Sequence, residues 1–242
     1  MKTVIIAQAR MGSSRLPGKV MMLLGGHSVI EHVVNRAFRA TRAEDVCIAT
    51  TVEPADDVVA LAAKSLGVAV FRGSECDVLG RFAGASAMMN ADIIVRITCD
   101  CPLIDPGVIN RSVQEFIDRN ADYVAQEWNE WPQGVGCEVF PRAMLDRAAA
   151  ESSSVYDREH VTPWIRNSGA SAKYWMPGPR GAVAEQRWLL DYPEDYDFLD
   201  KLYRRFPADK PPDSWEMIWQ VVRLHPELLA INKHLRENVR PK

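Results

Sequence analysis

Cationic side chains and glycines crowd into one short segment near the start of the chain. Between positions 8 and 19 the segment holds Arg10, Arg15 and Lys19, together with Gly12 and Gly18. Glycine lets backbone N–H groups approach an anion closely, and the arginine fork binds phosphate oxygens in pairs. This composition predicts a loop that binds phosphate groups. The alternative is a solvated polar loop that happens to be basic.

Two familiar phosphate-binding motifs do not describe this segment. A Walker loop needs four residues between its glycines and a serine or threonine after the lysine. Here five residues separate Gly12 from Gly18, and Val20 follows Lys19. The G-x-G-x-x-G spacing of a dinucleotide-binding turn is also absent from the segment. We therefore expect a third scheme of phosphate binding.

A carboxylate that could hold a metal ion lies where a predicted strand ends. Asp100 follows the apolar run 93–97 and precedes Cys101 and Pro102. Mg²⁺ prefers one or two carboxylates together with phosphate oxygens, so Asp100 suits a metal beside bound phosphate. The alternative is that Asp100 forms a turn before the proline. Asp105, followed by Pro106, is better explained as a helix N-cap.

The elements that must position these residues follow from hydrophobic periodicity. Ser28 and Glu31 have the spacing of a capping box at a helix start. Strand-like runs and helical segments alternate, which predicts an α/β fold with a mostly parallel central sheet and helices on both faces. In such sheets ligands bind beyond the carboxyl ends of the strands. We expect strands at 4–7, 46–50, 68–71, 93–97, 123–126, 137–140, 174–176 and 187–191, and helices at 29–41, 55–66, 77–90, after Asp105, at 158–167, 194–205 and from 214 onward with an interruption at Pro226.

Composition sets limits on the class of protein. Of 242 residues, 47% are hydrophobic and 25% charged, which is enough apolar material for a core and excludes a disordered chain. The net charge of −3 provides no basic field for nucleic acid or an anionic membrane. The longest apolar stretches run about six residues, against roughly 20 for a membrane span. We expect one cytoplasmic domain over 1–242, with a helical C-terminal extension from about 214.

The segment IIAQARMGSSRLPGKVMMLLGGHSVIEHVVNRA resembles the N-terminal signature of sugar cytidylyltransferases. It is most similar to the spore coat polysaccharide biosynthesis type, which is related to the 3-deoxy-manno-octulosonate and acylneuraminate cytidylyltransferases. The resemblance implies a Rossmann-like nucleotide-diphospho-sugar transferase fold in which this loop wraps the triphosphate of CTP. On that basis Arg10, Arg15 and Lys19 are phosphate ligands, and Gly12 and Ser13 contribute backbone contacts.

The resemblance also implies two ligands for Mg²⁺. The segment from Arg96 to Asp105 is similar to the family pattern R-x-T-G-D-C-P-L-I-D, whose first aspartate binds the metal and corresponds to Asp100. Cys99 stands where the family has glycine. A later D-x-P-E-D element assigns Asp191 as the second ligand, with Tyr192 where threonine is commoner. We expect both aspartates to end strands at one edge of the sheet. For Glu194 and Asp195, a place in the first helical turn, where the helix dipole favours acids, is sufficient explanation.

Contacts to the base are expected after the third strand. The run from Gly73 to Arg81 resembles the family's G-S-x-x-D-V-L-x-R, which places Arg72 and Ser74 near the cytosine. The alternative is a loop in which Asp77 caps the next helix.

Two later segments are candidates for the second substrate. Gly134 and Glu138 lie next to a predicted strand, and Glu159 and His160 belong to a segment that resembles the family element R-E-H-V-T-P-x-I. The alternative for the second segment is a solvated face or a local ion pair.

Together these features predict a nucleotidyltransferase. A sugar or sugar-acid oxygen attacks the α-phosphorus of CTP and pyrophosphate leaves, in the synthesis of surface polysaccharide or glycan precursors. We expect Arg10, Arg15, Lys19 and Asp100 to be catalytic. The alternatives are a transferase of the same fold that uses another nucleotide, and a catalytically silent binding protein. By analogy with related synthetases, the region 123–140 with Trp128 and Trp131 predicts a homodimer; these tryptophans could instead stack on a sugar ring.

Overall fold

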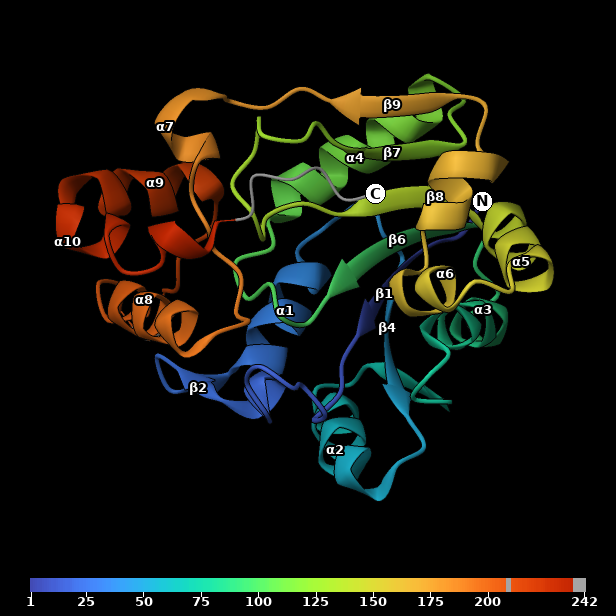
Figure 1. Ribbon diagram of the computed structural model, residues 1–242, viewed down its shortest axis with the longest axis horizontal. Helices are drawn as coiled ribbons and strands as arrows, with labels where there is room; N and C mark the ends of the chain where they lie inside the picture. Colours follow the sequence, from blue (N-terminus) through green and yellow to red (C-terminus); the bar gives the residue numbers. More distant parts are fainter. Residues whose placement is uncertain (208–209, 237–242) are drawn as a thin grey trace.

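A seven-stranded sheet forms the centre of the computed structural model, which describes residues 1–207 and 210–236 (Figure 1). The strand order is β5-β4-β1-β6-β8-β7-β9, and only β8 runs antiparallel to its two neighbours. A hairpin of two short strands lies apart from the sheet. The strands are β1 (Thr3–Gln8), β2 (Leu23–Leu24), β3 (His27–Ser28), β4 (Asp45–Thr51), β5 (Ala69–Gly73), β6 (Ile93–Thr98), β7 (Tyr123–Gln126), β8 (Glu138–Pro141) and β9 (Lys173–Met176).

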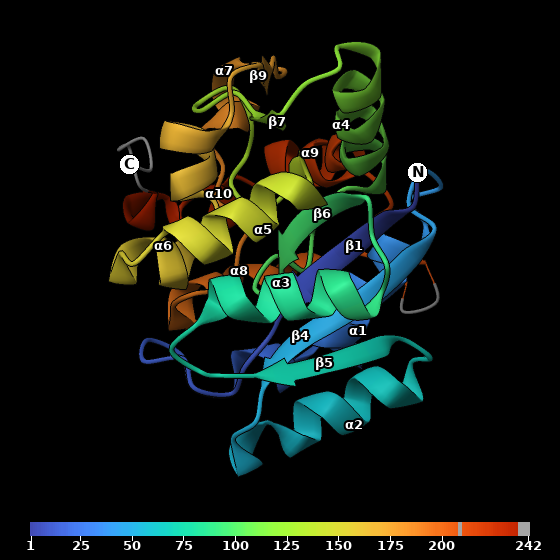
Figure 2. The same cartoon turned by 90° about the vertical axis from the view of Figure 1, so that its right-hand side faces the viewer.

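Helices cover both faces of the sheet, as the sequence predicts. Residues of α1, α2 and α4 share one buried cluster with the sheet, and residues of α3 and α5 share another on the opposite face. Figure 2 shows α3 in front of the strands and α1 behind them. The helices are α1 (Val29–Phe38), α2 (Asp57–Ser65), α3 (Val78–Met88), α4 (Pro106–Asp118), α5 (Arg142–Glu151), α6 (Val155–His160), α7 (Gly181–Ala184), α8 (Pro193–Tyr203), α9 (Trp215–Leu224) and α10 (Pro226–Leu229).

Local sequence signals explain where several elements begin. Ser28 and Glu31 form the predicted capping box at the start of α1. Asp105 caps α4 through the Val108 N–H at 2.9 Å, and its other carboxylate oxygen accepts from the Trp215 N–H at 2.7 Å. One aspartate therefore fixes the starts of both α4 and α9.

A third buried cluster joins the C-terminal segment to the rest of the chain. It contains residues of β2, α1, α8, α9 and α10, together with Trp131 and Trp188. Figure 1 shows α8, α9 and α10 grouped at the left of the view. Among the described residues, no helix has the length and apolarity needed to cross a membrane.

Two sequence-based predictions of secondary structure are wrong. The segment 187–191 is not a strand of the sheet, and pairs only through an isolated bridge between Arg187 and Gln133. Its apolar residues fill the third cluster instead, because Trp188 and Leu190 are fully buried there. The predicted helix 158–167 is broken after His160, where Val161 has a φ of 70°, and Ile165–Gly169 forms a separate π-helical turn.

Candidate active site

A cleft of about 360 Å³ lies beyond the carboxyl ends of β1 and β6. This is the position at which parallel sheets bind ligands. Its walls come from the cationic loop (residues 8–19), the start of α3, the segment after β6, the end of α6 and the segment that leads into α8. The lining residues include Arg10, Ser13, Arg15, Lys19, Arg81, Arg96, Asp100, Glu159, His160 and Asp191.

The Lys19 ammonium lies between the two aspartates that the sequence singles out. Lys19 Nζ is 3.1 Å from Asp100 Oδ2 and 2.6 Å from Asp191 Oδ1. Only 11% of the Lys19 side chain is exposed. Burial alone would lower the pKa of Lys19, but the two carboxylates raise it above its ordinary value, so the ammonium stays charged.

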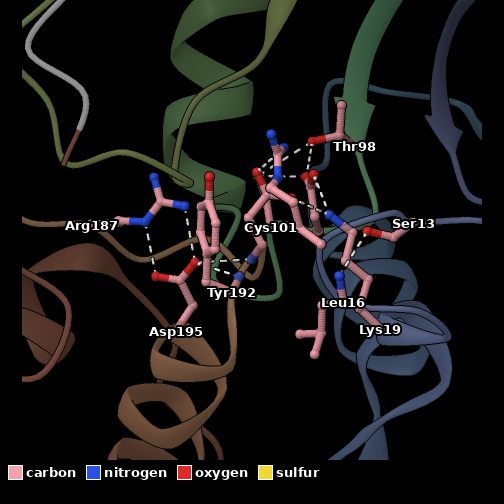
Figure 3. A network of polar contacts seen from close by, with 11 residues as sticks. Ser13, Leu16, Lys19, Thr98, Cys101, Arg187, Tyr192 and Asp195 are labelled. Atoms are coloured by element: carbon pink, nitrogen blue, oxygen red, sulfur yellow. Dashed lines mark hydrogen bonds and ion pairs between the residues drawn. The ribbon is translucent and has the colours of Figure 1, made fainter. Parts of the chain in front are cut away.

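Asp100 is held as a carboxylate by its neighbours. Burial alone would raise the pKa of Asp100, but the charge of Lys19 and a hydrogen bond from the Thr98 hydroxyl lower it below its usual range. The Cys101 thiol donates to the same carboxylate oxygen as Thr98, at 3.4 Å. Figure 3 shows Lys19, Thr98 and Cys101 meeting in this network.

Asp191 lines the cleft although it does not lie at the end of a sheet strand. The Leu190 N–H donates to the Asp100 backbone carbonyl at 2.7 Å, which places the two aspartates side by side. Arg15 Nη2 then pairs with Asp191 Oδ2 at 2.5 Å, and its guanidinium lies 5.3 Å from the centre of the Tyr192 ring. Two of the predicted phosphate ligands, Arg15 and Lys19, are therefore in direct contact with Asp191, the predicted metal ligand.

Asp195 has a larger role than the helix dipole explains, which corrects the sequence-based interpretation. Its carboxylate is fully buried and accepts both arms of the Arg187 fork, at 2.8 and 2.9 Å. It also accepts the backbone N–H groups of Asp191 and Tyr192, each at 3.0 Å. Figure 3 shows Arg187 and Asp195 facing each other beside Tyr192. This buried pair fixes the backbone that carries Asp191.

Two backbone hydrogen bonds to one carbonyl oxygen hold the cationic loop together. Both the Ser13 N–H and the Gly18 N–H donate to the Met11 carbonyl, at 2.9 and 3.0 Å. Gly18 has a φ of 71°, a left-handed conformation that glycine adopts without cost. The Met11 N–H is held in turn by Asp56 at 2.6 Å. Because the Ser13 N–H is already used within the loop, a contact from it to phosphate requires this bond to be exchanged.

Two arginines of the cleft, one buried and one half-buried, were missed by sequence reasoning. Arg81 is 2% exposed and donates to the Ser74 and Glu75 carbonyls, and Arg96 pairs with Glu138. Arg10, the predicted phosphate ligand nearby, pairs with Glu75 at 3.3 Å. The signal for Arg96 was a lone charge inside an otherwise apolar strand run.

A second cavity, of about 480 Å³, shares Arg96 and Thr98 with the cleft. Its lining includes Tyr123, Trp128 and Trp175, with Glu138 among them. The Glu138 carboxylate accepts hydrogen bonds from Tyr123, from Thr162 at 2.7 Å and from Arg96. Burial alone would raise the pKa of Glu138, but Arg96 and the two hydroxyl donors lower it, so Glu138 is ionised.

A strained turn connects this cavity with the cleft. Val161 is fully buried at φ 70° and ψ −57°, and the Thr162 N–H donates to the His160 carbonyl at 2.8 Å. These values define a γ-turn that a β-branched residue rarely adopts. Burial of Val161 and the bond from Thr162 to Glu138 hold it. The turn brings Glu159 and His160 to the cleft lining, where the sequence analysis placed a substrate contact.

Comparisons with known proteins agree with this geometry. The family model described as Cytidylyltransferase matches residues 4–211. The chain belongs to the cytidylyltransferase family. It is 34% identical to an uncharacterized protein of Methanocaldococcus jannaschii over 98% of this chain and 97% of that one. It is 33% identical to the spore coat polysaccharide biosynthesis protein SpsF of Bacillus subtilis, over 87% and 89% of the two chains. A solved cytidylyltransferase from Leptospira borgpetersenii superposes with a TM-score of 0.88 at 30% identity, over the whole of both chains.

This cytidylyltransferase does not bring every predicted residue to the cleft. Arg72 donates to the Thr51 and Glu53 carbonyls and pairs with Asp57 at 2.6 Å, so its guanidinium braces the ends of β4 and β5. Ser74 offers its carbonyl to Arg81 and is outside the cleft lining. The structure gives no support for base contacts by Arg72 or Ser74.

Asp77 and Arg158 have the alternative roles that the sequence left open, a helix N-cap and a local ion pair. Asp77 caps α3 through the Gly80 N–H at 2.8 Å. It also pairs with Arg158 at 3.2 Å, so Arg158 is held in a local ion pair although Glu159 and His160 line the cleft.

Gly134 and Gly12 have structural reasons to be glycine. Gly134 has a φ of 100°, and a Cβ there would lie 2.7 Å from the Trp188 carbonyl oxygen. It lines a third, smaller cavity and belongs to neither of the two larger ones. A Cβ at Gly12 would lie 3.0 Å from a Glu75 carboxylate oxygen. Gly12 therefore lets the loop approach the Glu75 carboxylate that pairs with Arg10.

The two tryptophans proposed for an oligomer contact lie in different surroundings in the structure. Trp131 is 7% exposed, donates to the Met176 carbonyl at 3.0 Å and packs on the Trp215 ring. Trp128 lines the second cavity. Trp131 is therefore a core residue, and its side chain is unavailable to a partner subunit.

The paired aspartates suit Mg²⁺ in a nucleotide complex. Within residues 1–207 and 210–236, no group of three or more histidine, cysteine or acidic side chains could hold a metal by itself. Mg²⁺ in nucleotide sites uses one or two carboxylates and takes its other ligands from phosphate and water. Asp100 and Asp191 already converge on one cationic atom, Lys19 Nζ, so their charge and direction fit such an ion.

Proposed function

We propose that this cytidylyltransferase transfers CMP from CTP to a hydroxyl oxygen of a sugar or sugar acid, with Mg²⁺ held by Asp100 and Asp191. The observation that carries the proposal is the Lys19 ammonium between these two carboxylates, in a cleft whose loop supplies Arg10 and Arg15. The resemblance to SpsF and to 3-deoxy-manno-octulosonate cytidylyltransferases supports a sugar-derived acceptor.

The cleft supplies what an in-line displacement at phosphorus needs. Such a reaction depends on alignment and on stabilisation of charge more than on covalent chemistry. Arg10, Arg15 and Lys19 bind the phosphates and stabilise the negative charge of the departing pyrophosphate. Mg²⁺, when bound, polarises the α-phosphate. Because Arg15 and Lys19 now pair with Asp191, the arrival of a triphosphate exchanges these contacts for phosphate oxygens.

The second cavity is the place we assign to the acceptor. It adjoins the cleft at Arg96 and Thr98, so a molecule bound there lies next to the nucleotide. Trp128 and Trp175 offer aromatic faces for a sugar ring. Two donors of the lining, Arg96 Nε and Trp128 Nε1, are buried without a hydrogen-bond partner among the described residues. The charged side chains of the lining, Arg96 and Glu138 among them, favour a polar acceptor over an apolar one.

The test is release of pyrophosphate from CTP in the presence of a panel of sugars and sugar acids. The proposal predicts turnover with at least one member of the panel, and with CTP in preference to ATP, GTP and UTP. Equal turnover with all four nucleotides would contradict the cytidine preference. Release that does not depend on any acceptor would contradict the transfer reaction.

We further propose that the enzyme acts as a homodimer in the cytoplasm. The analogy with related synthetases supports a dimer. Light scattering at micromolar concentration should give twice the chain mass of 27.2 kDa. A mass of one chain would contradict the dimer.

A further inference from the structure

The C-terminal segment reaches back to the buried pair behind Asp191. Asn232 follows α10 and is 4% exposed. Its side-chain amide donates to Asp195 Oδ1 and to the Arg187 carbonyl, each at 2.9 Å. Both N–H donors of one amide are thus used on the two residues of the buried ion pair. Asn232 lies beyond residue 211, where the family match ends.

The Asp195 carboxylate is saturated with donors. Oδ1 accepts from Arg187 Nε and from Asn232, and Oδ2 accepts from Arg187 Nη2 and from the N–H groups of Asp191 and Tyr192. A carboxylate offers about four acceptor positions, so this one has no freedom to rotate without breaking a bond. Loss of the Asn232 donor leaves Oδ1 held by Arg187 Nε alone, which loosens the carboxylate and, through it, the two backbone N–H groups that Oδ2 accepts.

Those two N–H groups belong to Asp191, which lines the cleft, and to Tyr192, which follows it. The Asp191 side chain meets Lys19 and Arg15, and the Tyr192 ring lies against the Arg15 guanidinium. The orientation of Asp191 is therefore set from behind by Asp195, and that of Asp195 in part by Asn232.

Packing of the C-terminal helices determines where Asn232 stands. Leu228 in α10 is 1% exposed in the third cluster, and α9 is tied to the start of α4 through Asp105. The Arg236 guanidinium donates to the Gln186 carbonyl at 2.8 Å, which fixes the chain on the other side of Asn232.

We propose that Asn232 is a positioning residue for the active site, acting through Asp195 to hold Asp191 in the orientation that binds the metal. The C-terminal segment is then part of the catalytic apparatus, although it lies outside the matched family region. This inference rests on the metal role proposed for Asp191.

The experiment measures CTP affinity by calorimetry, without acceptor, in the presence and absence of Mn²⁺ as a substitute for Mg²⁺. The ratio of the two affinities is the metal gain. Asn232→Ala should lower the metal gain about tenfold, in line with the effect of residues that orient metal ligands. Its metal-free CTP affinity should change less than twofold, because the phosphate-binding cations are untouched.

Leu145→Ala is the matched control. It removes a fully buried side chain from α5, in a cluster that contains no residue of the C-terminal segment, so it lowers the melting temperature and leaves the metal gain at the wild-type value. Equal loss of metal gain in Leu145→Ala and Asn232→Ala would show that general loosening is responsible and would overturn the proposal. Should the alanine variant fail to fold, Asn232→Ser replaces it and must show a loss of the same sign.

Asp191→Asn separates this inference from the proposed function. If Asp191→Asn loses the metal gain but Asn232→Ala keeps it, the positioning role is wrong and the metal site stands. If Asp191→Asn itself keeps the wild-type gain, the metal assignment fails and the role of Asn232 fails with it.

Discussion

Lys19 Nζ lies within hydrogen-bonding distance of both Asp100 and Asp191, although these aspartates come from distant parts of the sequence. A lysine ammonium thus bridges two carboxylates that would otherwise repel each other at the edge of the sheet. The same three charges are the ones that a metal–triphosphate complex must reorganise when it enters the cleft.

Removal of the lysine charge should make the fold sensitive to divalent metal. In Lys19→Met, Asp100 loses its ion-pair partner and Asp191 keeps only Arg15, so Mg²⁺ in the absence of nucleotide should raise the melting temperature by binding the folded state. The wild-type melting temperature should hardly respond. Thermal unfolding at several Mg²⁺ concentrations measures this difference. An identical response of both proteins would show that the two carboxylates do not form a cation site.

Arg15→Ala should weaken CTP binding by roughly 1.5–3 kcal/mol, because it removes a charge-assisted phosphate contact. Calorimetry with CTP measures the change. Arg39→Ala is a suitable control, since Arg39 pairs with Asp213 and is not among the cleft residues. Unchanged affinity in the Arg15 variant would remove this residue from the nucleotide site.

His32 should make stability fall on mild acidification. Its ring packs against Tyr203 and donates to the Leu24 carbonyl at 2.8 Å, and burial lowers the pKa of His32 to about 4. In the unfolded chain a histidine titrates near 6.5, so the unfolded state takes up the proton first as the pH drops. The stabilisation is complete above about pH 6.5 and is lost as the pH falls toward 4, by about 3 kcal/mol in full.

Denaturant unfolding between pH 7 and pH 4.5 tests the role of His32. His32→Gln keeps a donor for Leu24 but does not titrate, so its stability should fall less steeply with pH than that of the wild type. Parallel curves for the two proteins would assign the pH dependence to other groups.

Much of the fold could be predicted because its signals are local. The capping box at Ser28, the N-cap at Asp105 and the apolar strand runs each depend on neighbouring residues. The structure confirms the two caps and seven of the eight strand runs. The cleft position then followed from the rule that parallel sheets bind ligands at their carboxyl edge. Lys19 and Asp100 lie there as expected.

The features that could not be predicted depend on contacts between distant segments. The run 187–191 has the apolar pattern of a strand, yet its residues pack in the third cluster rather than in the sheet. Asp195 resembles an ordinary acidic residue of a helix start, and only its contacts with Arg187 and Asn232 show it to be buried. Arg72 has the charge of a ligand-binding residue, but its guanidinium donates hydrogen bonds to nearby backbone carbonyls instead.

The Mg²⁺ dependence of the Asp191→Asn enzyme tests the proposed metal site most directly. Asparagine keeps the shape of the side chain and removes its charge, so we predict a slower chemical step and a higher Mg²⁺ concentration for half-maximal rate. Because Asp100 and Asp191 serve one ion, the double variant should lose little more than the worse single variant. If Asp191→Asn keeps both the wild-type rate and the wild-type Mg²⁺ dependence, Asp191 is not a metal ligand and only begins the turn into α8.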